Sequence, residues 1–80
     1  MRLDKFLKVS RIIKRRTVAN GACDAGRVMV NGKVAKASVD VNVSDVIEMR
    51  FGSNTTKVRV LNINENPRKE EAALMYESVE

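Results

Sequence analysis

The feature that most constrains the fold is a change of hydrophobic periodicity within the first half of the chain. Up to Gly26 the apolar residues recur at helical spacing, whereas "RVMVNGKVAK", residues 27–36, alternates at the spacing of a strand. At the centre of this segment stands Asn31-Gly32, and both residue types tolerate the positive φ angles of a type I′ turn. The sequence therefore predicts a helical start that ends at Gly26, followed by a β-hairpin.

Two short helices are predicted before the hairpin. Residues 2–10 form a helix with an apolar side and an opposite, charged side that carries Asp4, Lys5, Lys8 and Arg11. A basic connector, 11–15, leads to a second helix over 16–25, with an apolar face made of Val18, Ala19, Ala22, Cys23 and Ala25. Gly21 costs this helix about 1 kcal/mol relative to Ala. Either a close neighbour leaves no room for a side chain at this position, or the helix is weak.

Alternating apolar residues predict three more strands beyond the hairpin, over 39–43, 46–51 and 57–63, with a loop at 52–56. The last segment, 66–80, has the pattern of a helix with Asn66 as its N-cap and Pro67 at its first position. Its docking stripe would consist of Ala72, Met75, Tyr76 and Val79. The predicted fold class is α+β, with two N-terminal helices packed on a small sheet of four to five short strands, plus a C-terminal helix.

Charge is distributed unevenly along the chain. Residues 1–36 hold ten Lys and Arg against two acidic residues, a net charge of +8, while residues 37–80 carry −3, which gives +5 in total. This polarisation predicts one face that meets a polyanion and another that meets solvent. No stretch approaches the ~20 apolar residues of a membrane span, and the basic start lacks the apolar region of a secretory signal. We therefore expect a cytoplasmic protein with no membrane partner.

The side chains needed for catalysis or metal binding are scarce. The chain has no histidine and a single cysteine, Cys23, so it lacks an imidazole base, a zinc ligand set and an internal disulfide. We expect Cys23 to pack in the core. The acidic residues fit turns or the first turn of a helix, and the glycines form no phosphate-binding loop. The pattern indicates a binding module without a cofactor and not an enzyme.

The basic residues form the candidate binding site. Cations from the first helix would meet those at the start of the second, where free N–H groups attract phosphate. The predicted RNA-binding residues are Arg2, Lys5, Lys8, Arg11, Lys14, Arg15, Arg16, Arg27, Lys33 and Lys36. Of the three aromatic residues, Phe6 and Phe51 fit the core, so no row of stacking rings is available. We therefore expect the chain to recognise the backbone and shape of structured RNA.

Two other interpretations of the same residues stay open at this point. The two helices and their connector could form a DNA-binding helix-turn-helix, although the outward residues of the second helix include few that read bases, namely Asn20, Gly21 and Asp24. The first helix is basic and amphipathic and could lie on an anionic membrane. Its apolar side, however, is needed for so small a core. The charge pattern favours structured RNA.

The segment "MRLDKFLKVSRIIKRRTVA…DAGRVMVNGKVAKAS" resembles the small RNA-binding domain, or alpha-L motif, first described in ribosomal protein S-four. The resemblance covers residues 1–38 and rests on the Arg-Leu-Asp-Lys start, Ser10-Arg11, Arg16, Ala19, and Gly26 ahead of Val28-x-Val30-Asn31-Gly32. With its "KEEAALMYE" tail, the chain is similar to the stand-alone ribosome quality control factors of Gram-positive bacteria, the RqcP family. It is also similar to the related ribosome-associated heat-shock protein of fifteen kilodaltons.

This resemblance implies a specific role. Such proteins bind the large ribosomal subunit after a stalled ribosome has split, and they contact ribosomal RNA and peptidyl-tRNA. The Gram-positive kind supports C-terminal alanine tailing of the nascent chain by a partner of the RqcH or NEMF type. Arg2, Arg11 and Arg16 match the family's RNA-contacting positions. The resemblance implies an RNA-binding domain over 1–64, a C-terminal helix or tail over 65–80, association with the ribosome, and a monomer off it. A general structured-RNA-binding or ribosome-assembly protein is the alternative.

Overall fold

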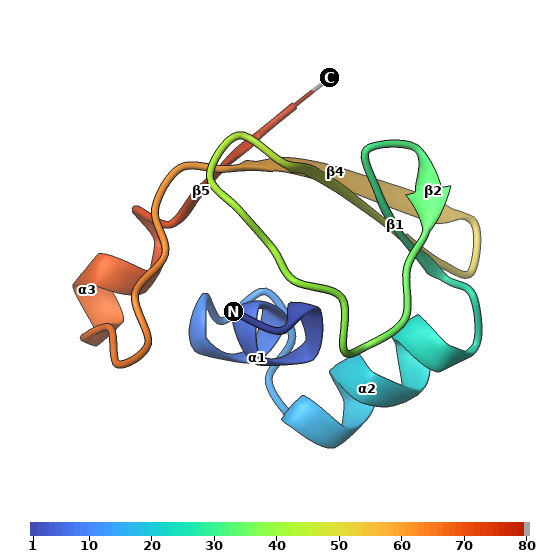
Figure 1. Ribbon diagram of the computed structural model, residues 1–80, viewed down its shortest axis with the longest axis horizontal. Helices are drawn as coiled ribbons and strands as arrows, with labels where there is room; N and C mark the ends of the chain where they lie inside the picture. Colours follow the sequence, from blue (N-terminus) through green and yellow to red (C-terminus); the bar gives the residue numbers. More distant parts are fainter. Residues whose placement is uncertain (80) are drawn as a thin grey trace.

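The computed structural model describes residues 1–79 as an antiparallel sheet with helices on one side (Figure 1). The sheet has five strands in the order β2-β1-β3-β4-β5. The elements are α1 (Leu3–Val9), α2 (Arg16–Asp24), β1 (Val28–Val30), β2 (Lys33–Val34), β3 (Val46–Phe51), β4 (Asn54–Val60), α3 (Lys69–Ala72) and β5 (Tyr76–Ser78). The predicted α+β class is confirmed, with its two N-terminal helices and a small C-terminal helix. None of the helices within residues 1–79 has the length and apolar character needed to cross a bilayer.

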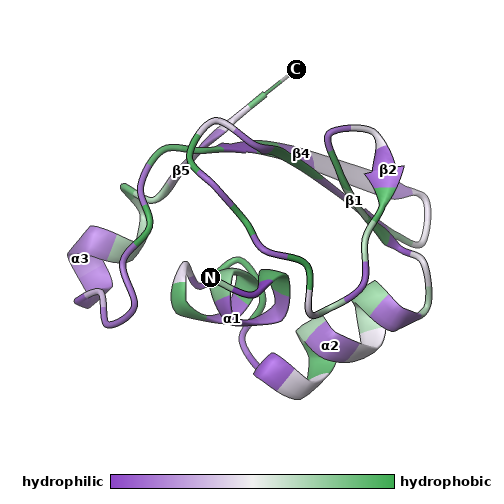
Figure 2. Cartoon of the chain, in the orientation of Figure 1, coloured by the Kyte–Doolittle hydropathy of each residue, from purple (hydrophilic) through white to green (hydrophobic). Residues whose placement is uncertain are grey.

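The core lies between the N-terminal helices and the inner face of the sheet. Leu3, Phe6 and Leu7 of α1 are fully buried, as their helical spacing predicts. Alternate residues of β3 and β4 are buried opposite them, namely Ile47, Met49, Val58 and Val60. Cys23 of α2 is also part of this core, as expected. Figure 2 shows the mixture of hydrophobic and hydrophilic residues along α1 and α2, in contrast to the mainly hydrophilic α3.

The end of α2 follows the sequence prediction. Gly26 has a φ angle of 76°, and its N–H donates to the Cys23 carbonyl at 3.0 Å. The next N–H, that of Arg27, donates to the Ala22 carbonyl at 3.0 Å, which completes a Schellman motif. Within the helix, a Cβ placed on Gly21 would meet nothing within 4 Å. No neighbour therefore requires a glycine at Gly21, and the second of the two explanations applies: this turn of α2 is intrinsically weak.

The β1–β2 hairpin turns at the predicted dipeptide. Asn31 and Gly32 have φ angles of 52° and 82°, as a type I′ turn requires. The Asn31 side chain does more than allow the turn. Its Nδ2 donates to Asp45 Oδ1 at 3.0 Å, and its Oδ1 accepts the N–H of Val46 at 3.0 Å. The hairpin turn is thereby fixed to the start of β3.

Two predictions on the sheet are wrong. Residues 39–43 do not form a strand with a partner strand; Asp40 makes only an isolated bridge to Arg2. This segment runs along the N-terminus instead, where the Leu3 N–H donates to the Val39 carbonyl at 2.8 Å. The loop after β3 is also shorter than the predicted 52–56, because β4 already begins at Asn54. Gly52, with a φ angle of 60°, begins this tight turn.

Of the predicted helix over 66–80, Glu80 lies outside the described residues, and the rest is limited to one helical turn, α3. Arg68, and not Asn66, is its N-cap, and the Arg68 N–H donates to Glu71 Oε1 at 2.8 Å. Ala72 and Met75 are buried as the docking stripe requires, but the chain then extends as β5, which pairs with β4 through Val60↔Tyr76. A helical pattern and a short edge strand are hard to separate here because the partner strand lies far away in sequence. The division of the chain at residue 64 stays a prediction.

Candidate nucleic-acid interface

Two of the predicted arginines are held together by one carboxylate. Asp4 of α1 has a side chain only 4% exposed, and its Oδ1 accepts from Arg2 Nε at 3.2 Å. Arg16, at the start of α2, places its Nε 3.4 Å from Oδ2 of the same carboxylate. The side chains of Arg2 and Arg16 remain 51% and 48% exposed. Each guanidinium is therefore fixed on one edge while its other N–H groups face solvent, which suits it to bind a second anion.

The carboxylate of Asp4 is itself well supported. Asn20 Nδ2 donates to Oδ2 at 3.2 Å and the Lys5 backbone N–H to Oδ1 at 2.8 Å. Burial alone raises the pKa of Asp4, but the hydrogen bonds from Asn20, Arg16, Arg2 and the Lys5 N–H together outweigh it, so the pKa lies below its usual value of 3.8. Asp4 is consequently ionised at neutral pH and keeps both arginines in place.

The start of α2 adds free N–H groups to this cluster. Arg15 is the N-cap of α2, and it makes no side-chain capping hydrogen bond. A shallow hollow of about 330 Å³ lies at this helix end, lined by Asp4, Arg16, Thr17 and Asn20. A helix N-terminus without a side-chain cap offers unsatisfied N–H groups and partial positive charge. Together with Arg16, this end of α2 can receive a phosphate group.

A second hollow lies beside the connector between α1 and α2. It has a volume of about 440 Å³ and is lined by Lys8, Val9, Arg11, Lys14 and Pro67. No acidic side chain within residues 1–79 pairs with its three cations; the ion pairs of that part of the chain involve other bases. Three unneutralised positive charges around one hollow favour a polyanion. The connector, residues 11–15, joins this hollow to the start of α2, where Arg16 lies.

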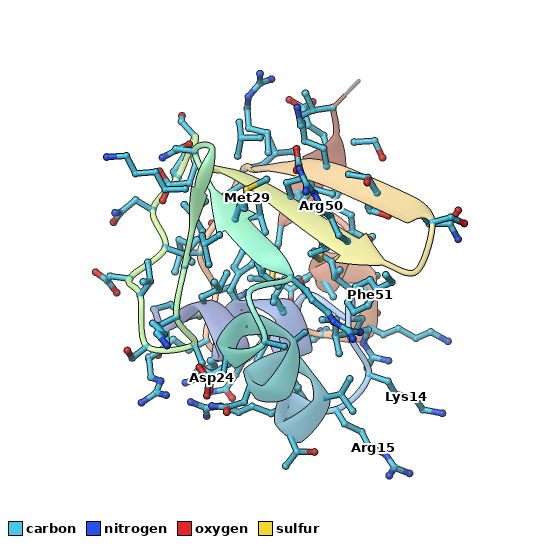
Figure 3. The ribbon with its side chains drawn as sticks, turned by 90° about the vertical axis from the view of Figure 1, so that its right-hand side faces the viewer. Lys14, Arg15, Asp24, Met29, Arg50 and Phe51 are labelled. Carbon is cyan, nitrogen blue, oxygen red and sulfur yellow. The ribbon has the colours of Figure 1, made fainter. Side chains whose placement is uncertain are left out.

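The remaining predicted residues are distributed less uniformly. Lys14 and Arg15 project on the same side of the view in Figure 3, and Asp24 lies on the other side. Lys5 turns toward the C-terminal segment, where its Nζ lies 3.0 Å from Glu65 Oε1. Arg27, Lys33 and Lys36 are exposed but line neither hollow. Arg27 directly follows the end of α2, where its N–H donates to the Ala22 carbonyl, whereas Lys33 begins β2 and Lys36 follows that strand. A role for these three in binding RNA stays a prediction.

Sequence reasoning missed several residues that shape this surface. Asp4 was predicted on the exposed side of α1, and this was wrong because α2 packs against that edge of the helix. The available signal was its position next to Leu3 and one turn before the buried Leu7. Val18 was predicted in the apolar face of α2 but is 52% exposed. Phe51 was predicted in the core but is 38% exposed, because it lies at the end of β3 beyond the cover of the helices.

The first 47 residues match the S4 domain family. The likeness to a solved structure covers nearly all of the chain. The structure of heat shock protein 15 from Vibrio cholerae superimposes with a TM-score of 0.90, at 31% identity, over 99% of this chain and 81% of that one. The chain therefore belongs to the S4 domain family of RNA-binding proteins, as its sequence indicated.

Within this family, the similarity is high to one group of proteins. The RQC P-site tRNA stabilizing factor of Streptococcus pneumoniae is 56% identical over 99% of this chain and 90% of its own length. The protein of the same name in Bacillus subtilis is 54% identical over 95% of this chain and 88% of its own length. A heat shock protein 15 homolog from Haemophilus influenzae is 31% identical over all of this chain and 62% of its own length. Identity over nearly the whole length places the chain in the group of RQC P-site tRNA stabilizing factors.

Proposed function

We propose that this protein is a non-enzymatic RNA-binding factor of ribosome-associated quality control, which stabilises P-site tRNA on the stalled large ribosomal subunit. The observation that carries the proposal is identity of 54–56% over at least 95% of the chain with factors of that name. The fold adds an independent physical argument, because it collects cations around α1, the connector and the start of α2, and three of them, Lys8, Arg11 and Lys14, have no acidic partner within residues 1–79. Phosphate contacts supply most of the affinity of such RNA-binding surfaces.

In this proposal the two hollows bind two stretches of nucleic-acid backbone. Arg2 and Arg16, fixed by Asp4, hold one stretch, and Lys8, Arg11 and Lys14 hold the other. The phosphates of large-subunit ribosomal RNA and peptidyl-tRNA repel each other. Cations on both sides of the connector would neutralise phosphates of both RNAs, so the protein can join them. The connector is short, so the two stretches would be held at a fixed spacing.

The proposal also covers the cellular location of the protein, its partner proteins and its oligomeric state. The protein is ribosome-associated in the cytoplasm and supports C-terminal alanine tailing of the nascent chain by a partner of the RqcH or NEMF type. Off the ribosome it is a monomer. The support for these statements is the resemblance to the quality control family.

The binding surface is tested by the salt dependence of affinity for large subunits that carry P-site tRNA. Each phosphate contact contributes about 0.7–0.9 to the slope of log affinity against log salt. Arg16→Ala should weaken binding and lower this slope by about one contact. Arg59→Ala is the matched control. It removes the same charge from the outer face of the sheet, where Arg59 pairs with Glu77 at 3.1 Å. Equal effects of the two variants would show that only net charge matters.

The cellular role is tested by deleting the gene and restoring it with either variant. Loss of alanine-tailed peptides that Arg59→Ala restores and Arg16→Ala does not restore is the expected result. Accumulation of precursor subunits with normal tailing would instead indicate a general role in ribosome assembly. Recovery of mature whole ribosomes alone in a pull-down would also contradict the proposal, because a stabilizing factor of stalled large subunits should bring down free large subunits with tRNA.

A further inference from the structure

The inner face of the sheet extends past the helices near the β3–β4 turn, and a groove opens there. It has a volume of about 360 Å³ and lies between the connector and strands β3, β4 and β5. Its floor is apolar, since it includes the buried Met49 and Val58. Phe51 lines the groove while 38% of its surface is exposed. The groove therefore has an accessible aromatic wall, which the sequence pattern had placed in the core.

The same groove is connected to the cationic surface through one residue. Arg11 lines both this groove and the hollow that contains Lys8 and Lys14. Figure 3 shows Phe51 on the same side of the view as Lys14 and Arg15. At the other rim, Thr56 and Ser78 contribute hydroxyl groups from β4 and β5. An apolar floor, an aromatic wall, polar rims and a cation at one end are thus combined in one groove.

The backbone at Arg11 supports a role for its side chain. Arg11 follows the C-cap of α1 and has a φ angle of 64°, in the left-handed region that favours glycine at this position. Its N–H donates to the Lys8 carbonyl at 3.0 Å, as in a normal helix ending. The backbone thus needs only a glycine, and the arginine adds strain without helping the helix to end. The strain at Arg11 therefore needs an explanation other than helix termination, and its guanidinium, which lines both the groove and the hollow of Lys8 and Lys14, offers one.

We propose that this groove receives one unpaired nucleotide of the bound RNA. The base stacks on Phe51 over the apolar floor, its phosphate lies at Arg11, and the continuing backbone follows the hollow of Lys8 and Lys14. A nucleotide fits these surfaces because it joins a flat apolar face to an anionic group. The inference rests on the proposed function and refines it: the protein recognises RNA with a base that is already unstacked, in addition to the backbone of paired regions.

The test compares two RNA duplex stems that differ in one nucleotide only: one is fully paired, and the other carries a single added, bulged 2-aminopurine. The wild-type protein should bind the bulged stem about tenfold more tightly, and the 2-aminopurine fluorescence should fall on binding because the base stacks. Phe51→Leu keeps an apolar side chain but removes the ring. It should weaken binding of the bulged stem about five- to tenfold and leave the paired stem unchanged. Phe51→Tyr should bind like wild type. Val34→Ala, at an apolar residue of β2 that is 63% exposed, is the control.

The outcomes separate this inference from the proposed function. Thermal unfolding of each variant first establishes that it is folded. Equal affinity of the wild type for both stems overturns the nucleotide site, even if large subunits are still bound. Equal weakening of both stems by Phe51→Leu also overturns it, because Phe51 would then act only through the structure of the sheet. Failure to bind either stem or the large subunit would instead contradict the proposed function itself.

Discussion

Replacing Asp4 by Asn tests whether one buried carboxylate organises the binding surface. The change removes the charge and one of the two acceptor oxygens that serve Arg2, Arg16, Asn20 and the Lys5 N–H. Hydrogen bonds that involve a charged group contribute about 1.5–3 kcal/mol, against about 0.5–1.5 kcal/mol for neutral ones. Since both arginines stay half-exposed and water can replace part of what is lost, we expect Asp4→Asn to lower the free energy of unfolding by about 2–3 kcal/mol. For a domain of this size the midpoint would fall on the order of 10–20 °C.

The same carboxylate predicts a pH dependence. Because the pKa of Asp4 is lowered in the folded state, the unfolded chain binds more protons at acid pH, and the stability from Asp4 rises with pH. This contribution is complete above the ordinary value of 3.8 and is lost as the pH falls from 3.8 toward the lower folded value. The difference in stability between wild type and Asp4→Asn should therefore shrink on acidification.

The assay is denaturant unfolding of both proteins between pH 7 and pH 3, together with titration of tRNA-bearing large subunits at pH 7. Asp4→Asn makes the protein more positive, so a simple charge effect would tighten RNA binding. Loss of the organised arginine pair should weaken it instead. Asp24→Asn, the same change at an exposed end of α2, is the control. If both variants unfolded and bound alike, or if the stability difference did not depend on pH, the role assigned to Asp4 would be refuted.

Three further predictions concern single positions. Gly21→Ala should stabilise the protein by about 0.5–1 kcal/mol, since nothing obstructs the methyl group; a lower unfolding midpoint in calorimetry would contradict the assignment of α2 as a weak helix. Arg11→Gly should raise stability by about 0.5–1 kcal/mol because glycine adopts positive φ freely, while RNA affinity falls; denaturant unfolding and RNA titration measure the two effects, and a destabilised variant would disprove the strain. Burial raises the pKa of Cys23 to about 11, so the native thiol should resist alkylation at pH 8 and react only upon unfolding, which mass spectrometry can follow; rapid labelling of the native protein would show that the core is open there.

Elements that depend on neighbours in sequence were predictable, and those that depend on distant partners were not. Helix α2 and the Asn31-Gly32 turn were recognised because capping and turn geometry are set within a few residues. β5 was missed because its ladder requires β4, and Val60 lies far from Tyr76 in sequence.

The same limit applies to the binding site. The cations were visible as residue types, but the pairing of Arg2 with Arg16 through Asp4 needs α2 to pack on α1. No periodicity within a single helix encodes that contact.

The Asn31 side chain makes this protein susceptible to deamidation. An asparagine before glycine can deamidate spontaneously: the unhindered backbone nitrogen of Gly32 attacks the side-chain carbonyl carbon and expels ammonia, and water then opens the resulting succinimide to a carboxylate. In this fold the amide nitrogen donates to Asp45 Oδ1 at 3.0 Å, so deamidation would replace a donor by a second negative charge against that carboxylate. In deamidated molecules the contact between the hairpin turn and the start of β3 would be weaker, while the rest of the chain would be unchanged. Storage would therefore produce a mixed population, separable by charge, in which the younger fraction is the more stable.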